Sequence, residues 1–155
     1  MRLRLVAVGT RMPAWVTEGF NDYAARMPRE CRLELREVAL GRRSRGADAA
    51  RAIATEGERL LAASAGCLRI CLDVRGAAVD TAGLSRRLAG WLQDGQDVAL
   101  LVGGPDGLAP ECLEAARWRW SLSSLTLPHG LVRVLVAEQI YRAWTMLTGH
   151  PYHRE

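Results

Sequence analysis

Lysine is missing from this sequence of 155 residues, because all 21 of its basic residues are arginine. A phosphate-binding P-loop needs a lysine, so that class of nucleotide site is excluded. Coding bias in a GC-rich genome explains the missing lysine more simply than function does. The chain also has no apolar run long enough to cross a bilayer, and its first residues lack the pattern of a secretory signal. We therefore expect a cytoplasmic protein that does not enter a membrane.

Cysteine is scarce, and its spacing does not match a metal or redox site. The four cysteines are Cys31, Cys67, Cys71 and Cys112. No two of them form a C-x-x-C pair, and Cys67 and Cys71 fall within a strand-like run. We therefore interpret the cysteines as small buried hydrophobic residues of a protein in a reducing compartment.

The remaining composition is that of an ordinary globular domain. Hydrophobic residues make up 49% of the chain and charged residues 25%, which excludes a disordered tail, a collagen-like repeat and a disulfide-stapled miniprotein. A chain of this length can bury one core of its own. We expect a single domain over residues 1–155.

The positive charge is concentrated in the first third of the chain. The net charge is +4, and residues 1–46 hold ten arginines against five acidic residues. Arginine is densest in the run Gly41-Arg42-Arg43-Ser44-Arg45-Gly46. A glycine-flanked arginine cluster of this kind can follow a phosphate backbone. A solvent-exposed loop explains the run equally well, so both interpretations stay open.

Strand-like and helix-like patterns alternate along the chain. Apolar or alternating runs predict strands at residues 3–9, 33–40, 68–74, 98–102 and 121–127. Helical spacing predicts helices at residues 13–27, at 47–65, from Thr81 to Gly95, from Pro110 onward and at 131–147. Thr81 has the side chain of a helix cap. Because the elements alternate without a linker or a repeat, we expect an α/β domain with a mainly parallel sheet flanked by helices.

Ligands of such sheets bind beyond the carboxyl ends of the strands. Three predicted strand ends are candidates: Leu72-Asp73, Gly103-Gly104 and Leu127-Pro128-His129. Glycines straight after an apolar strand let backbone N–H groups approach a ligand. The run from Gly103 to Gly107 fits that role, although a plain turn would use the same residues. Its spacing is not that of a dinucleotide-binding loop.

The segment Ser121–His129 combines hydroxyl groups with leucines. Its three serines and one threonine could bind a ligand while the leucines enclose a flat ring. An amphipathic strand with a polar solvent face would look the same. The segment lacks the G-x-S-x-G pattern that places a serine nucleophile, so we do not expect a hydrolase.

The predicted helix at residues 131–147 is apolar on nearly every side, which points to a subunit interface as readily as to the core. Glu138 and Arg142 form an i, i+4 pair on it. Arg133 stands alone one turn earlier, and a buried arginine is costly unless it meets an anion. That anion could be a ligand or a carboxylate of a second subunit.

All three histidines fall in the last 27 residues, at His129, His150 and His153. Histidine titrates near neutrality, so the cluster could transfer protons or bind phosphate. His150 and His153 have a spacing seen among metal ligands, but Pro151 prevents a helical pair and no cysteine or acidic set completes a site. We expect no metal.

Several motifs run from end to end of the chain: Leu5–Thr10, Gly103–Leu108, Leu125–His129, Leu131–Ala143 and Pro151–Glu155. Their order and spacing resemble those of a known family, the ribosomal RNA large subunit methyltransferase H family of the SPOUT class. Each motif is modest, but together they are specific.

This resemblance implies a trefoil-knotted α/β fold and a homodimer. It also implies that S-adenosylmethionine donates a methyl group, leaving S-adenosylhomocysteine without the help of a metal. The implied acceptor is N3 of a pseudouridine in 23S rRNA, on the assembled ribosome.

The resemblance also implies site residues. The cofactor site would comprise Leu72, Gly103, Gly104, Leu122, Ser123, Ser124, Leu125, Thr126 and Leu127. The catalytic candidates are His129, Arg133, Arg142, Tyr152, His153 and Arg154. The arginines would favour the N3 anion, and His129, Tyr152 or His153 would be the general base or position the nucleobase. In a dimer, the tail of one subunit could complete the pocket of the other.

Two other classes of protein stay open from the residues alone. A nucleotide-binding module would bind the cofactor or ATP without turnover. A ribosome maturation factor would use its arginines, and its glycine turn would be only a turn.

Overall fold

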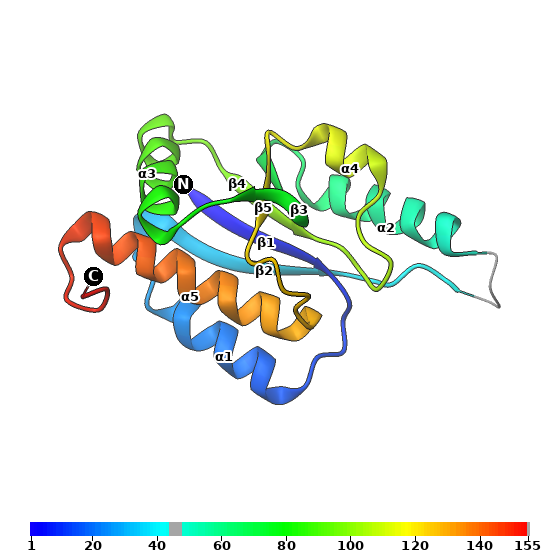
Figure 1. Ribbon diagram of the computed structural model, residues 1–155, viewed down its shortest axis with the longest axis horizontal. Helices are drawn as coiled ribbons and strands as arrows, with labels where there is room; N and C mark the ends of the chain where they lie inside the picture. Colours follow the sequence, from blue (N-terminus) through cyan, green and yellow to red (C-terminus); the bar gives the residue numbers. More distant parts are fainter. Residues whose placement is uncertain (44–47, 155) are drawn as a thin grey trace.

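The computed structural model describes residues 1–43 and 48–154, which form a parallel sheet with helices on both faces (Figure 1). The strands are β1 (Arg2–Val8), β2 (Arg32–Val38), β3 (Leu68–Ala78), β4 (Val98–Val102) and β5 (Trp118–Ser121). Their order is β2-β1-β4-β3-β5, and each neighbouring pair is parallel. This confirms the predicted α/β class and the parallel sheet.

The described residues form five helices and a 3₁₀ turn at Arg29–Cys31; four of the helices connect strands, and the fifth follows the last strand. They are α1 (Ala14–Ala25), α2 (Ala49–Ala63), α3 (Thr81–Asp94), α4 (Pro110–Ala115) and α5 (His129–Thr148). Helices α1, α3 and α5 cover one face of the sheet, and α2 and α4 cover the other (Figure 1). Among the described residues, no helix is long and apolar enough to span a membrane.

The central strand β4 shows why both faces are covered. All five of its residues are buried, since Leu100 packs toward the α5 side and Leu101 toward the α2 side. Continuous apolar strands are typical of parallel sheets between two helical layers. The interpretation of the cysteines as buried residues is confirmed for Cys31, Cys71 and Cys112. All four cysteines are free thiols, but Cys67 is only half-buried.

Two local predictions are wrong. The strand predicted at residues 121–127 is instead β5 at Trp118–Ser121, and the chain continues from there as a loop. The alternation of Trp118 and Trp120 with arginine is too short to stand out, whereas the serine-rich run imitates an amphipathic strand. The cap of α3 is Asp80 rather than Thr81, because an Asp80 side-chain oxygen accepts a 2.7 Å hydrogen bond from the Gly83 N–H.

Candidate functional site

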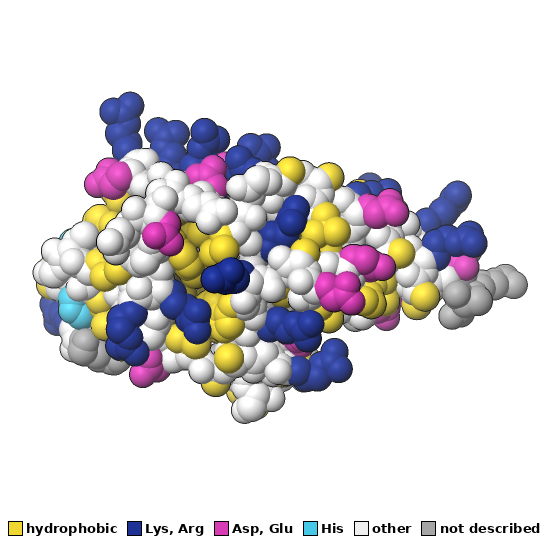
Figure 2. Space-filling view, turned by 90° about the horizontal axis from the view of Figure 1, so that it is seen from above, with side chains coloured by type: hydrophobic (Ala, Val, Ile, Leu, Met, Phe, Trp, Pro, Cys, Tyr) yellow, Lys and Arg dark blue, Asp and Glu magenta, His cyan; other side chains and the backbone are white. Residues whose placement is uncertain are grey.

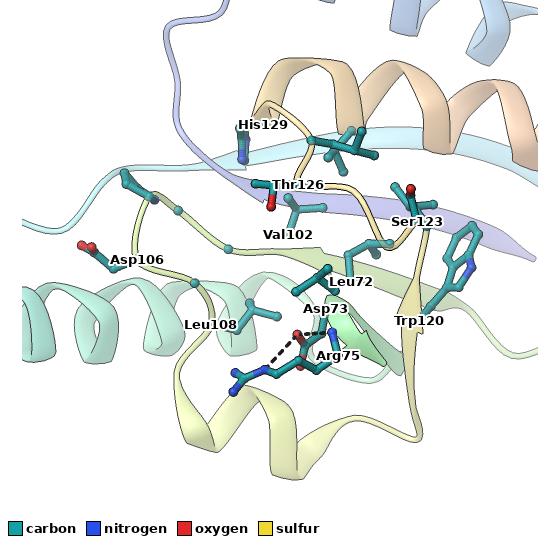
Figure 3. A pocket seen from close by; sticks show the side chains of 18 of the residues that line it. Leu72, Asp73, Arg75, Val102, Asp106, Leu108, Trp120, Ser123, Thr126 and His129 are labelled. Carbon is teal, nitrogen blue, oxygen red and sulfur yellow. Dashed lines mark hydrogen bonds and ion pairs between the residues drawn. The ribbon is translucent and has the colours of Figure 1, made fainter. Parts of the chain in front are cut away.

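A cavity of about 560 Å³ opens at the carboxyl ends of the strands (Figure 3). Its walls come from residues 72–75 within β3, from the chain after β4 and β5, and from the start of α5. The three segments singled out from the sequence therefore meet in one place. Only Gly103-Gly104 directly follows a strand, since Leu72-Asp73 lies within β3 and Leu127–His129 follows the loop after β5. Parallel strands point their carboxyl ends to the same edge, which explains why segments far apart in sequence share this cavity.

The glycine run after β4 is both a turn and a wall of the cavity. Gly107 N–H donates to the Gly104 carbonyl at 3.1 Å, and Gly107 has a φ of +88°. A Cβ added at Gly103 would lie 2.7 Å from the Gly107 carbonyl carbon. The tightness of the turn thus requires glycine, and the turn presents its backbone to the cavity.

The loop after β5 lines the opposite wall. Leu122, Ser123 and residues 125–127 face the cavity, whereas Ser124 lies in a neighbouring cavity instead. The hydroxyl groups hold the loop itself: Ser121 Oγ donates to the Ser123 carbonyl at 3.0 Å, and Ser123 Oγ accepts from Leu125 N–H at 3.0 Å. The leucines remain to enclose a flat ligand, and Leu125 is 69% exposed.

Asp73 brings negative charge into the cavity. Its side chain is only 12% exposed and accepts a hydrogen bond from Arg75 N–H at 3.1 Å, with Arg75 Nε 3.7 Å away (Figure 3). The sequence located Asp73 at a strand end but did not identify it as a site residue. Val102 and Trp120 also line the cavity, and they were not identified as site residues from the sequence. Because Val102 ends a predicted strand, its position could have indicated that it lies at the site.

His129 and Arg133 lie at the start of α5, and only His129 lines the cavity. Arg133 is 1% exposed, and its Nη1 lies 2.6 Å from a side-chain oxygen of Glu37 at the end of β2. The anion that Arg133 requires therefore comes from its own chain rather than from a second subunit.

The tail follows the end of α5 and folds back along the helix (Figure 1), so that Tyr152 contacts Glu138 and Tyr141. The Glu138 carboxylate links the tail to α5, because it accepts hydrogen bonds from Arg142 Nε at 2.8 Å and from Tyr152 Oη at 3.1 Å. His153 is half-buried and Arg154 is exposed. With 20 residues in α5, the helix is about 30 Å long. A single chain thus brings together His129 and the cofactor candidates other than Ser124, whereas the tail candidates do not line this cavity.

Tyr152 is held as a hydrogen-bond donor. Burial raises the pKa of Tyr152 above its usual value, and a hydrogen bond with Tyr23 and the charge of Glu138 raise it further. Its ring packs 4.7 Å from the ring of Tyr141, between centroids. The tail is therefore docked on α1 and α5, with a phenol that stays protonated at neutral pH.

Three comparisons relate the chain to known proteins. The family model described as "Predicted SPOUT methyltransferase" matches residues 1–153. The chain is 60% identical over 154 residues to the ribosomal RNA large subunit methyltransferase H of Alkalilimnicola ehrlichii, covering 99% of both chains. It is 57% identical to the protein of the same name from Methylococcus capsulatus, covering 99% of this chain and 100% of that relative. Among solved structures, a probable methylase family protein from Haemophilus influenzae Rd KW20 matches 97% of this chain and 69% of its own, with a TM-score of 0.61 and 12% identity. At that identity the likeness shows the fold alone.

Proposed function

Because the chain belongs to the SPOUT methyltransferase family, we propose that it methylates N3 of a pseudouridine in 23S rRNA, with S-adenosylmethionine as the donor and the assembled ribosome as the substrate. The observation that carries this proposal is the full-length identity of 60% to a ribosomal RNA large subunit methyltransferase H. We infer that the cavity at the strand ends is the site of that activity.

The cavity fits S-adenosylmethionine in size and in chemistry. A volume of about 560 Å³ falls within the range of small-molecule sites. Leucines of the 122–127 loop can enclose the adenine ring, and the backbone of the glycine turn can bind its polar edge. Asp73 supplies a negative charge to a ligand that carries one net positive charge. When bound, this cofactor supplies a methyl group made electrophilic by its sulfonium.

The proposed assembly is a homodimer with a trefoil knot in each chain. Helix α5 supports the dimer, because apolar side chains stay half-buried on it in the single chain. These are Leu131, Val132, Val134, Leu135, Trp144 and Met146. A second copy would cover them, and the tail of one subunit would complete the cavity of the other. This arrangement accounts for catalytic candidates that do not line the cavity of their own chain. They lie at and beyond Glu138 and Arg142, about 14 and 20 Å along α5 from His129.

The tail residues have separate roles in this proposal. Arg142 and Arg154 favour the N3 anion by their positive charge. Tyr152 positions the nucleobase, since its raised pKa opposes formation of a phenolate. His153 takes the N3 proton, and its Nδ1 is buried without a hydrogen-bond partner among residues 1–43 and 48–154. An in-line arrangement of N3 and the methyl group then lowers the barrier by proximity.

The RNA contact uses a second cavity of about 810 Å³ beside the first. Arg86 and Arg87 of α3 and serines of the 121–124 segment line it. The Arg87 guanidinium stacks 3.9 Å above the ring centroid of Trp118, while Arg87 itself remains exposed. Figure 2 shows arginine side chains around an apolar hollow on the side of the molecule seen from above. Arginines of this kind can neutralise phosphates of the rRNA.

Tritium transfer from labelled S-adenosylmethionine tests the proposal. Ribosomes that lack this methyl group, free rRNA and fully methylated ribosomes are incubated with the protein in parallel. We expect label in the 23S rRNA of the unmethylated ribosomes, at pseudouridine N3 after digestion. Cofactor binding without label would point to a non-catalytic binding module, and ribosome binding without cofactor binding would point to a maturation factor.

A further inference from the structure

A buried polar network at the candidate site surrounds the guanidinium of Arg133. Its Nη1 donates to Glu37 Oε2 at 2.6 Å, and its Nη2 donates to the Gly9 carbonyl at 2.8 Å. Its Nε lies 3.2 Å from Nε2 of His129. One buried side chain thus reaches the chain after β1, the end of β2 and the first turn of its own helix.

The chemistry of arginine decides the protonation state of His129. A guanidinium has five N–H donors and no acceptor, so Nε2 of His129 must accept and carries no proton. The proton of the neutral ring is then on Nδ1, which leaves this nitrogen to hydrogen-bond with the backbone of Gly103. Both ring nitrogens are therefore occupied by the protein, although the ring forms part of the cavity wall.

The electrostatics favour the same state. Burial lowers the pKa of His129, and the positive charge of Arg133 lowers it further. The hydrogen bond with the Gly103 backbone and the charge of Glu37 act in the opposite direction and only offset part of this effect. The titratable and charged groups that face the ring are thus Arg133 and Glu37.

We propose that His129 and Arg133 are positioning residues of the methyl-transfer site, and that His129 is not its general base. A base needs a free lone pair within reach of the proton that it takes, and Arg133 occupies the only lone pair of His129. The network instead holds the ends of β1, β2 and β4 against the start of α5, because Gly9, Glu37 and Gly103 are all joined through these two side chains. This assignment of roles rests on the proposed function.

Histidine ring NMR on the full chain tests the protonation state without any need for activity. The His129 signals are assigned by their loss in His129→Gln. We expect a neutral ring at pH 7 with Nδ1 protonated and Nε2 bare, and a titration below the ordinary value of 6.5. A ring protonated on Nε2, or an imidazolium at pH 7, would overturn the inference even if the protein methylates rRNA as proposed.

Enzyme kinetics and cofactor binding test the positioning role. The glutamine amide of His129→Gln can still accept from Arg133 but cannot titrate, so we expect a loss of kcat smaller than the roughly 10²–10⁴-fold loss of a missing general base, with the acidic limb of the pH profile retained. His129→Leu removes both ring hydrogen bonds and should weaken S-adenosylmethionine binding about tenfold or more. Arg133→Met should also weaken S-adenosylmethionine binding, whereas Arg51→Met, at an exposed position of α2, should not.

The contrary outcomes are distinct from failure of the proposed function. A general base contributes about 10²–10⁴-fold to the rate, so a loss of that size in His129→Gln, with cofactor binding intact and the acidic limb of the pH profile gone, would make His129 the base. Unchanged cofactor binding in His129→Leu would remove the positioning role. If His129→Leu does not fold, His129→Gln still decides between base and positioning. Wild-type protein that transfers no methyl group would contradict the proposed function, and the NMR result would then stand on its own.

Discussion

Arg43 binds the buried carboxylate of Glu56 through two nitrogen atoms, Nη1 at 2.7 Å and Nη2 at 3.2 Å. Its Nε also donates to Asp106 in the glycine turn at 2.9 Å. Glu56 is 2% exposed and accepts a further hydrogen bond from Gly41 N–H at 2.8 Å. The beginning of the arginine-rich run is therefore anchored to α2 and to the wall of the cavity. Of the three arginines in that run, Arg43 has a structural partner, and Arg45 lies outside the described residues.

Replacing Arg43 with alanine should destabilise the protein by about 2 kcal/mol. Breaking a buried ion pair leaves the remaining charge without a partner, and the 27% exposure of the Arg43 side chain reduces the cost. Chemical denaturation measures the change. Arg42→Ala is the matched control, since Arg42 is exposed and the structure gives its side chain no hydrogen bond or ion pair within residues 1–43 and 48–154. Equal stability of the two variants would show that the Arg43 contacts do not contribute.

Acidification should destabilise the protein through His129. Burial and the charge of Arg133 lower the pKa of His129 from 6.5 in the folded state, so the unfolded chain binds a proton near pH 6.5 that the folded protein does not. His129 therefore does not lower the free energy of unfolding above pH 6.5. As the pH falls below 6.5, protonation of the unfolded chain lowers the free energy of unfolding. Thermal unfolding at pH 7.5 and 5.5 should show a larger loss of Tm for wild type than for His129→Gln. An equal loss in the two proteins would contradict the prediction.

Strands β1 to β4 and the cavity edge could be predicted because they depend on local patterns, whereas β5 is too short to stand out. Strand β4 is apolar at every position, and strand ends of a parallel sheet gather at one edge. The partner of Arg133 could not be found in this way, since Glu37 is 96 residues away in sequence and any buried carboxylate would satisfy the same need. The position of the tail also escaped prediction, because the chain folds back after α5 through contacts of Tyr152 with Glu138 and Tyr141 that no local pattern indicates.

Neutralising Arg86 and Arg87 together should weaken binding to the ribosome and leave cofactor binding unchanged. Each phosphate contact that is lost removes about 0.7–0.9 from the slope of log affinity against log salt concentration. Binding of Arg86→Gln/Arg87→Gln to ribosomes at several salt concentrations gives this slope. Arg51→Gln on α2 serves as the control. A double variant with the wild-type slope would place the RNA contact elsewhere.

Asp73→Asn should weaken binding of S-adenosylmethionine about tenfold, a loss of roughly 1.4 kcal/mol. The amide keeps an acceptor for Arg75 N–H but removes the negative charge that faces the cationic ligand. S-adenosylhomocysteine lacks the sulfonium charge, so its affinity should change less. Calorimetry measures the change in affinity for each ligand. Asp94→Asn, at an exposed position of α3, is the control. Equal losses for the two ligands would mean that Asp73 acts through shape or hydrogen bonding rather than charge.

Complementation between two inactive variants should reveal whether the tail acts on the partner's cavity. Asp73→Arg places a positive charge in the cavity and should abolish cofactor binding, and His153→Ala should lower kcat at least 100-fold if His153 is the base. Light scattering first establishes that each protein is a dimer.

A purified mixed dimer would then contain one intact site, formed by the cavity of the His153→Ala chain and the tail of the Asp73→Arg chain. We expect it to have about half the wild-type activity, although neither parent dimer is active. If each tail served its own cavity, both sites of the mixed dimer would carry a defect and it would be as inactive as its parents. A His153→Ala dimer with the wild-type rate would exclude His153 from proton transfer.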